Sequence, residues 1–171
     1  MPKRYDIMKP LPMISAAACL FFIVATAAHA EPKKEDVPEL LKALKSGNAK
    51  KRISAADDLG HIGAIRADDA KEAVPVLLDM LKNDRAAGVR KAVATALGRM
   101  DPDPQEAVPV LSKALKDKDA GVRAAAATSL GQLGADAKDA VPALNEARKD
   151  KDRNVSRAAG MALRSIQGKK K

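Results

Sequence analysis

Apolar residues recur along this chain with the spacing of an amphipathic helix, and the spacing itself returns at a regular interval. Segments 37–44, 74–81 and 108–115 each begin with Val-Pro and then carry apolar residues at positions 0, 3, 4 and 7, with one serine in the third segment. A fourth Val-Pro stands at 141–142, so the prolines are 37, 34 and 33 residues apart. This spacing places one apolar face on a helix, and proline suits the first turn, where an N–H has no partner within the helix. The pattern therefore predicts four helices that begin at Val-Pro.

A second amphipathic pattern follows each of these helices after a short polar turn. Apolar or alanine positions at 0, 4, 8 and 11 run through 89–100, 122–133 and 155–166, and a degenerate copy covers 51–60. Asn48, Asp119 and Asp152 precede three of these segments, where the side-chain oxygen of an N-cap is favoured. No segment alternates as a strand does. Each unit is therefore a helical hairpin, and four units cover about 35–70, 71–104, 105–137 and 138–167.

One such hairpin cannot bury its apolar faces alone, so the units must stack into an α-solenoid. The segments AVPVLLDMLKNDRAAGVRKAVATALGRM (73–100) and AVPVLSKALKDKDAGVRAAAATSLGQLG (107–134) resemble HEAT repeats, specifically the compact bacterial type also called PBS-lyase HEAT-like. Signatures of tetratricopeptide and ankyrin repeats are absent. The resemblance covers nearly all of 31–168 and implies an all-α solenoid of four HEAT-like hairpins.

The resemblance also implies a hydrogen-bonded ladder, in which an aspartate of the turn and the arginine of Val-Arg link the stack. The residues at the two ladder positions are Arg52, Asp84, Arg90, Asp117, Arg123 and Asp150. The first repeat carries Ser46 in place of the acid, and the last repeat carries Ser156 in place of the base. If each arginine paired within its own repeat, Arg52 and Asp150 would be left over. Pairing with the following repeat satisfies all six residues, and we predict that arrangement.

Two points about the ladder stay open in the sequence. The second repeat has an extra turn residue, so Asn83 is an alternative to Asp84 at the acidic position. A ladder that ends at both terminal repeats indicates that four repeats form the whole array, and Asn145 and Arg148, which replace inner leucines of earlier repeats, support a polar cap. Ordinary divergence of a terminal repeat is the alternative explanation.

The first 30 residues have the three parts of a secretory signal peptide. Basic residues come first, an uncharged apolar run covers 11–28, and Ala28-His29-Ala30 forms a small-x-small cleavage site. We expect cleavage before Glu31 and export to the periplasm or the cell exterior, with no stable membrane span afterwards. An uncleaved anchor is the main alternative, since about 18 apolar residues lie near the lower limit for a span. A lipoprotein is disfavoured, because Ala16 stands three residues before Cys19 where a large aliphatic residue is usual.

Removal of this leader would also remove residue types that many catalytic and binding sites require. The only cysteine and the three aromatic residues of the 171-residue chain lie within its first 22 residues. Disulfides, thiolate nucleophiles and cysteine-ligated metals are thereby excluded from the remainder. His61 is the only histidine after the leader, and the chain has no His-Glu pair of the kind that holds iron in HEAT-like hydroxylases. We therefore expect that the protein is not an enzyme and that it binds no metal or cofactor.

Charge is sorted between the two edges of the predicted stack. The net charge of the whole chain is +9, and that of 31–171 is +7. Turns within hairpins carry +4 in 42–51 and +1 in each of 82–87, 113–119 and 146–153, whereas the connections 66–72, 101–106 and 135–139 carry −1, −3 and −1. Helix-dipole matching accounts for this sorting as a structural effect. The functional alternative is a basic rim, extended by the lysines 169–171, that binds an anionic polymer or membrane surface. Without aromatic residues the pattern does not favour nucleic acid.

A candidate surface for a protein partner lies on the second helices, opposite their core stripe. This face is expected to form a concave wall with a small central column of Ala56, Ala94, Ala127 and Gly160. Binding energy in protein interfaces concentrates on large side chains and arginines, and the candidate anchors are Lys91, Arg157, Met161 and Arg164. The sequence thus favours an exported, non-catalytic scaffold that binds an unidentified protein, with electrostatic binding through the basic rim as the alternative.

Overall fold

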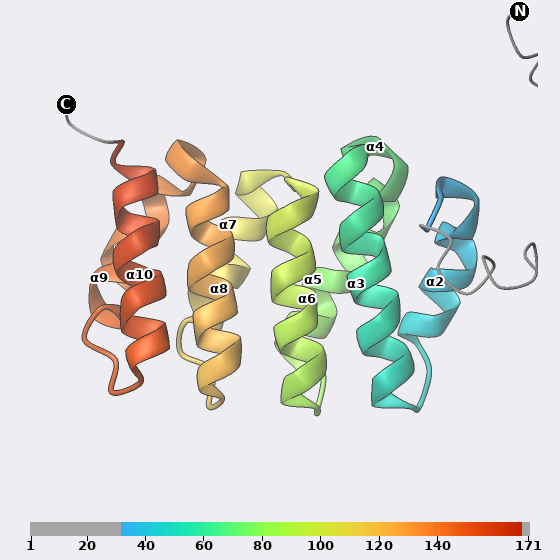
Figure 1. The fold of residues 1–171 in the computed structure, drawn as a ribbon, viewed down its shortest axis with the longest axis horizontal. Coiled ribbons are helices and arrows are strands. Elements are labelled where there is room, and N and C mark those ends of the chain that lie inside the picture. The colour runs from blue at the N-terminus through green and yellow to red at the C-terminus, as the bar shows by residue number, and fades with distance from the viewer. Residues whose placement is uncertain (1–31, 169–171) are drawn as a thin grey trace, which may run out of the picture. The chain divides into compact units, whose positions relative to one another are not determined.

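The Val-Pro segments and the patterns that follow them form helices where the sequence predicts them. The computed structural model describes residues 32–168, and these contain no strand. Its four hairpins (Figure 1) consist of α2 (Val37–Leu44) with α3 (Ala49–Ile65), α5 (Val74–Asn83) with α6 (Ala87–Met100), α7 (Pro104–Ala114) with α8 (Ala120–Gln132), and α9 (Val141–Ala147) with α10 (Arg153–Ile166). The all-α solenoid is confirmed. The predicted leader and the lysines 169–171 lie outside the described residues.

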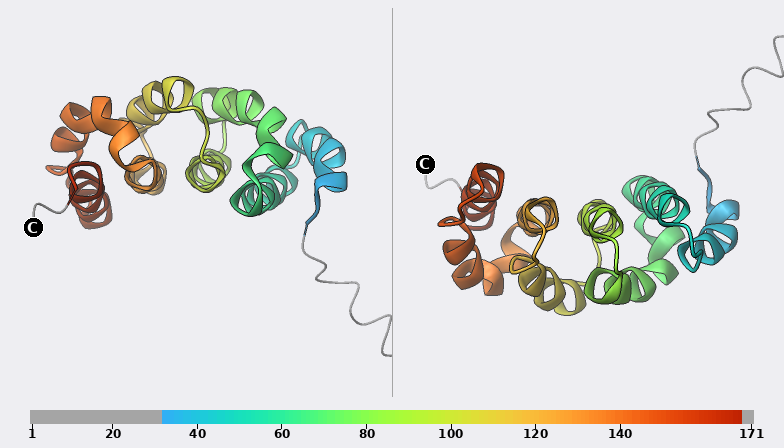
Figure 2. Two further views of the ribbon diagram at one scale, coloured as in Figure 1. Left: turned by 90° about the horizontal axis from the view of Figure 1, so that it is seen from above. Right: turned by 90° about the horizontal axis from the view of Figure 1, so that it is seen from below.

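The helices are arranged in two rows along an arc. The first helices of the hairpins, α2, α5, α7 and α9, form the outer row, and the second helices, α3, α6, α8 and α10, form the inner row on the concave side (Figure 2). Each inner helix packs against its hairpin partner; α6 and α8 also pack against two inner helices each, and the terminal α3 and α10 against one each. The two middle inner helices therefore have neighbours on three sides.

The connections between hairpins are helical rather than open loops. They contain the short helix α4 (Ala67–Ala70) and the 3₁₀ turns η3 (Lys71–Ala73) and η4 (Gly134–Ala140), and another 3₁₀ turn, η2 (Lys34–Asp36), precedes α2. The third outer helix also begins one turn earlier than the predicted Val108. Asp103 caps it by accepting from the Gln105 N–H at 2.8 Å, and Pro104 supplies a first residue with a suitable φ. Pro109 consequently lies inside α7.

The predicted N-caps of the inner helices are confirmed. Asn48 Oδ1 accepts from the Lys50 N–H at 2.9 Å, and Asp119 Oδ1 accepts from the Val122 N–H at 3.1 Å. Asp152 Oδ1 accepts from two successive N–H groups at 2.8 and 3.3 Å. These bonds satisfy N–H groups that have no partner within the helix, and they set the residue at which each inner helix starts.

One hydrophobic core runs through all four hairpins. Large side chains without solvent contact come from every repeat, and those of leucine are Leu59, Leu77, Leu97, Leu111, Leu130 and Leu144. The inner-helix pattern at 0, 4, 8 and 11 is buried as expected, since Val89, Val93 and Leu97 are 0% exposed and Met100 is 2% exposed. Because the core crosses each boundary between repeats, neighbouring hairpins stabilise one another.

The expected central column of the concave wall is wrong at three of its four positions, and the fourth, Gly160, is partly exposed. Ala56, Ala94 and Ala127 are each 0% exposed and lie in the contacts between inner helices instead of on an open floor. The physical reason is that successive inner helices pack closely against one another, and small side chains allow that approach. A Cβ added at Gly131 would lie 2.9 Å from the Cα of Ala162, which shows how near the two backbones approach.

Candidate functional site

Three bidentate ion pairs link the turns of successive hairpins. Arg52 Nε and Nη2 donate to the two carboxylate oxygens of Asp84 at 2.7 and 2.9 Å. Arg90 meets Asp117 at 2.8 Å through both nitrogens, and Arg123 meets Asp150 at 2.7 and 3.0 Å. Each arginine thus reaches the carboxylate of the following repeat, which is the pairing expected from the sequence.

Each ladder arginine also binds the backbone of its own turn. Its Nη1 donates to the carbonyl oxygen six residues earlier, at 2.8 Å in all three cases, and these carbonyls belong to Ser46, Asp84 and Asp117. Within its own repeat, each arginine therefore binds a backbone carbonyl, whereas the carboxylate that it binds belongs to the next repeat. A single guanidinium consequently fixes the shape of one turn and its distance from the next.

The ladder aspartates shape the turns as well as pairing with arginine. Oδ1 of each accepts from the backbone N–H two residues later, at 2.8 to 2.9 Å, and the donors are Ala86, Asp119 and Asp152. Asn83 does not take the place of Asp84. It is the last residue of α5, and its Nδ2 donates to Asp79 Oδ1 at 2.8 Å.

Serine stands in place of the missing ladder acid in the first repeat and in place of the missing base in the last repeat. Ser46 Oγ accepts from the Asn48 N–H at 3.2 Å. Each ladder aspartate likewise accepts from the N–H two residues later in the chain. Ser156 Oγ donates to the Arg148 carbonyl at 2.7 Å, eight residues earlier, whereas each ladder arginine reaches the carbonyl six residues earlier. Ser46 therefore keeps the local hydrogen bond of the acid that it replaces, and Ser156 makes a different one.

The ladder groups are largely removed from water, and this sets their protonation. Their side chains are between 6% and 15% exposed. Desolvation raises the pKa of Asp117, but hydrogen bonds from Arg90 and the Asp119 N–H outweigh it, so the pKa lies below its usual value. The pKa of Asp150 is lowered first by the hydrogen bond from Arg123. The pKa of each arginine is raised, chiefly by the hydrogen bond to its aspartate.

The four candidate anchors for a partner are all exposed, but the structure does not gather them at one place. Lys91 lies on α6, whereas Arg157, Met161 and Arg164 lie on α10. A groove of about 310 Å³ opens between α8 and α10, and only Arg157 and Met161 of the four line it. Its full lining is Thr128, Gly131, Gln132, Asn154, Arg157, Ala158, Met161, Ala162 and Ser165.

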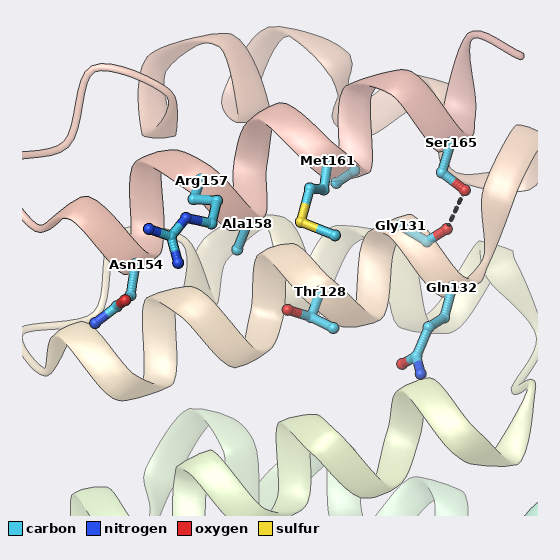
Figure 3. Close-up of a pocket in the computed structure, with 9 residues that line it drawn as sticks. Thr128, Gly131, Gln132, Asn154, Arg157, Ala158, Met161 and Ser165 are labelled. Atoms are coloured by element: carbon cyan, nitrogen blue, oxygen red, sulfur yellow. Dashed lines mark hydrogen bonds between the residues drawn. The ribbon is translucent and has the colours of Figure 1, made fainter. Parts of the chain in front are cut away.

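The groove is built from a close helix contact flanked by larger side chains. Near the C-terminal ends of α8 and α10, Gly131 packs against Ala162, and Ser165 Oγ donates to the Gly131 carbonyl at 2.7 Å. Met161 extends from α10 toward α8, while Asn154 and Gln132 mark opposite ends of the groove (Figure 3). Sequence reasoning did not single out Gln132, Asn154 and Ser165, because only the packing of α8 against α10 brings them together.

The concave face from α6 to α10 carries positive charge only. The helices α6, α8 and α10 contain no Asp or Glu, and the acids of the inner row are Asp57 and Asp58 of α3. Arg90 and Arg123 form ladder ion pairs with Asp117 and Asp150. Among residues 32–168, no salt bridge involves the exposed cations of these three helices, which are Lys91, Arg99, Arg153, Arg157 and Arg164.

The turn edge of the array is basic and exposed. The ladder aspartates of the turns form ion pairs with arginines of the inner helices. These aspartates therefore do not neutralise the other cations of the turns. These exposed cations include Lys45, Lys82, Arg85, Lys116, Lys118, Lys149 and Lys151. Lys116 contacts the exposed Glu146 at 3.3 Å. His61 is exposed on α3.

Two further properties concern the part of the chain that the structure describes. Within it, no group of three or more His, Cys, Asp or Glu side chains could hold a metal ion. None of its helices combines the length and the apolar character that crossing a bilayer requires.

The comparisons with known proteins agree with the two-row helical array. The sequence profile of HEAT repeats matches residues 37–105 and 100–164, and the chain belongs to this family. No curated protein matches the chain. Among solved structures, it is similar to the crystal structure of an engineered protein from the Northeast Structural Genomics Consortium, with 28% identity and a TM-score of 0.63. That match covers 77% of this chain, which spans 62% of the engineered protein.

Proposed function

We propose that this chain is an exported, non-catalytic HEAT-repeat scaffold that binds a protein partner in the periplasm or cell envelope. HEAT repeats commonly mediate protein interactions, and the chain belongs to that family. The observation that carries the proposal is the concave row of inner helices, which presents an open groove with an exposed methionine and arginine. Large apolar side chains and arginines concentrate binding energy at protein interfaces.

Export and the bacterial PBS-lyase HEAT-like type are parts of the same proposal. Both rest on the sequence, through the leader at 1–30 and through the Val-Pro, turn aspartate and Val-Arg pattern of the repeats. Fractionation of the native cells followed by mass spectrometry tests the export. We expect a periplasmic or extracellular product that begins at Glu31, and a cytoplasmic product with an intact leader would contradict it.

Crosslinking of the protein in its native envelope, followed by capture and identification of what is attached, tests the scaffold function. We expect a small set of protein partners whose attachment is saturable and is competed by unlabelled protein. Absence of any saturable protein partner would contradict the proposal. Purified protein that retained a metal or an organic cofactor would favour an enzyme instead.

A second candidate function is electrostatic binding of an anionic polymer or a membrane surface. Its support is the row of exposed cations at the turns, which outnumber the acids of the same segments, together with the lysines 169–171. Salt separates the two functions, because exposed charges lose most of their mutual attraction when the Debye length falls to about 10 Å at 0.1 M ionic strength. Binding that disappears between low and moderate salt supports the rim, whereas a packed protein interface persists.

A further inference from the structure

We propose that the groove between α8 and α10 binds an extended, acidic segment of the partner protein. In this arrangement a carboxylate of the segment pairs with Arg157, and a neighbouring aliphatic side chain packs against Met161. The inference rests on the proposed scaffold function and names the chemistry of the partner that this site selects.

The apolar half of the site is defined by Met161. Its side chain is 57% exposed, and Ile65 is the other exposed large hydrophobic residue among residues 32–168. Unlike Ile65, Met161 stands over a floor of small residues, Gly131, Ala158 and Ala162. The groove volume of about 310 Å³ lies at the lower end of the ~300–1,000 Å³ found for ligand sites. It therefore accommodates a side chain with its flanking backbone, and the flexible thioether adapts to aliphatic groups of different shape.

The charge of the site selects an acidic partner. Arg157 is exposed beside the groove and forms no salt bridge with another described residue. The helices α6, α8 and α10 bring no acidic residue to the concave face, so a basic segment would be repelled there. Asp119 and Asp152, which precede α8 and α10, use their carboxylates to accept from backbone N–H groups. A guanidinium binds a carboxylate through two parallel hydrogen bonds, which gives the pair a defined orientation.

The ends of the groove suit the backbone of an extended chain. Asn154 of α10 and Gln132 of α8 lie at opposite ends with Met161 between them (Figure 3). A side-chain amide offers both a donor and an acceptor, which match the N–H and C=O of a peptide unit. Helices satisfy their own backbone groups, so amides at both ends favour an extended segment over a helical one.

Fluorescence anisotropy with defined peptides tests the inference. The probe is a labelled nine-residue Ser/Gly peptide with Glu-Leu-Glu at its centre, and the comparison peptides carry Gln-Leu-Gln or Glu-Ser-Glu instead. We expect either replacement to weaken binding about tenfold, since each removes one anchor. In the protein, Arg157→Gln and Met161→Ala should each weaken binding of the Glu-Leu-Glu peptide by about five- to tenfold.

Matched controls carry the same chemical changes away from the groove. Arg85→Gln removes a charge from the basic rim, and Ile65→Ala removes an exposed aliphatic side chain from the end of α3. Both should bind the peptide within about twofold of the wild type. All four positions are exposed, so circular dichroism should show unchanged helix content.

Several outcomes would overturn the inference. They are no binding of the Glu-Leu-Glu peptide by the wild type, binding of that peptide by both groove variants with wild-type affinity, equal affinity of the wild type for Glu-Ser-Glu and Glu-Leu-Glu, and a larger loss in Arg85→Gln than in Arg157→Gln. The envelope crosslinking separates this failure from that of the scaffold function. If the R157Q/M161A double variant captures the same saturable partners as the wild type, the groove is not the site and the scaffold function stands. If the wild type captures none, the scaffold function itself fails.

Discussion

At the scale of single residues, the ladder arginines have several tasks that no other side chain performs together. Arg90 contacts both carboxylate oxygens of Asp117 and also the Asp84 carbonyl, and its side chain is 6% exposed. Three nitrogens of one planar guanidinium supply these bonds in a fixed geometry. A lysine supplies a point charge with three donors and cannot hold two turns in this way.

The first prediction is that Arg90→Lys destabilises the protein by about 1–3 kcal/mol, because hydrogen bonds to a charged group are lost and a shielded carboxylate keeps an imperfect partner. Urea unfolding followed by circular dichroism measures this free energy. Arg99→Lys is the control, since Arg99 is exposed on the same helix and makes no salt bridge within the described residues. Equal stability of the Arg90 and Arg99 variants would show that the ladder contributes little.

The second prediction concerns acid. Because the pKa of Asp117 is lowered in the folded protein, mainly by hydrogen bonds that outweigh desolvation, its contribution to stability is present above the unfolded pKa of about 4. It is lost as the pH falls through the lower folded pKa. The stability difference between the wild type and Asp117→Asn should therefore be largest near neutral pH and shrink below about pH 4. Thermal melts at a series of pH values test this, and a constant difference would contradict it.

At the scale of helices, glycine and alanine decide how closely the inner row packs. A Cβ added at Gly60 would lie 2.9 Å from the Cα of Ala96, and the same distance applies between Gly131 and Ala162. In both cases the obstacle is backbone, which cannot turn aside as a flexible side chain can. The small residues that the sequence places on the second helices therefore fix the spacing of the array.

The third prediction compares two glycines on adjacent inner helices. Gly131→Ala should destabilise the protein by about 1–3 kcal/mol, because α8 and α10 must move apart. Gly160→Ala should leave stability equal or raise it by about 0.5–1 kcal/mol, since a Cβ there meets no atom within 4 Å and alanine favours the helix. Thermal and urea unfolding of both variants measure the contrast. Loss of stability in both variants, or in neither, would contradict the expectation.

At the scale of the whole molecule, the array is held by contacts between nearest neighbours. The core crosses every boundary between hairpins, and a rung of the ladder reinforces each of the three boundaries. In such arrays stability is a sum of repeat and interface contributions, so a weakened boundary releases the repeat beyond it before the rest unfolds.

The fourth prediction is that Arg123→Met loosens the last hairpin selectively. Its rung joins the turn of the third repeat to Asp150 in the fourth. Amide hydrogen exchange should become faster in α9 and α10, while α3 and α6 keep their protection, because local opening follows the weakest boundary. Arg52→Met is the matched variant and should loosen the first hairpin. Uniform acceleration in both variants would indicate a single cooperative unit.

The sequence by itself determined the helices and the caps, and the resemblance to HEAT repeats implied the ladder. Helix positions follow from local periodicity, and the caps follow from single polar residues at helix starts. Once the resemblance implied a ladder, counting the residues at its positions chose the pairing, since only pairing with the next repeat leaves neither Arg52 nor Asp150 without a partner. Turn chemistry explains the one shifted start, where Asp103 caps α7 a turn before Val108.

Only the tertiary structure decided which part of the inner helices meets solvent. Ala94 and Ala127 are expected on the face opposite the core stripe, yet both are buried, because neighbouring inner helices cover them. The groove between α8 and α10 joins residues such as Gln132 and Asn154 that share no local pattern. Their proximity depends on how closely two helices from different repeats approach, and side-chain size across that contact sets it rather than any periodicity along the chain.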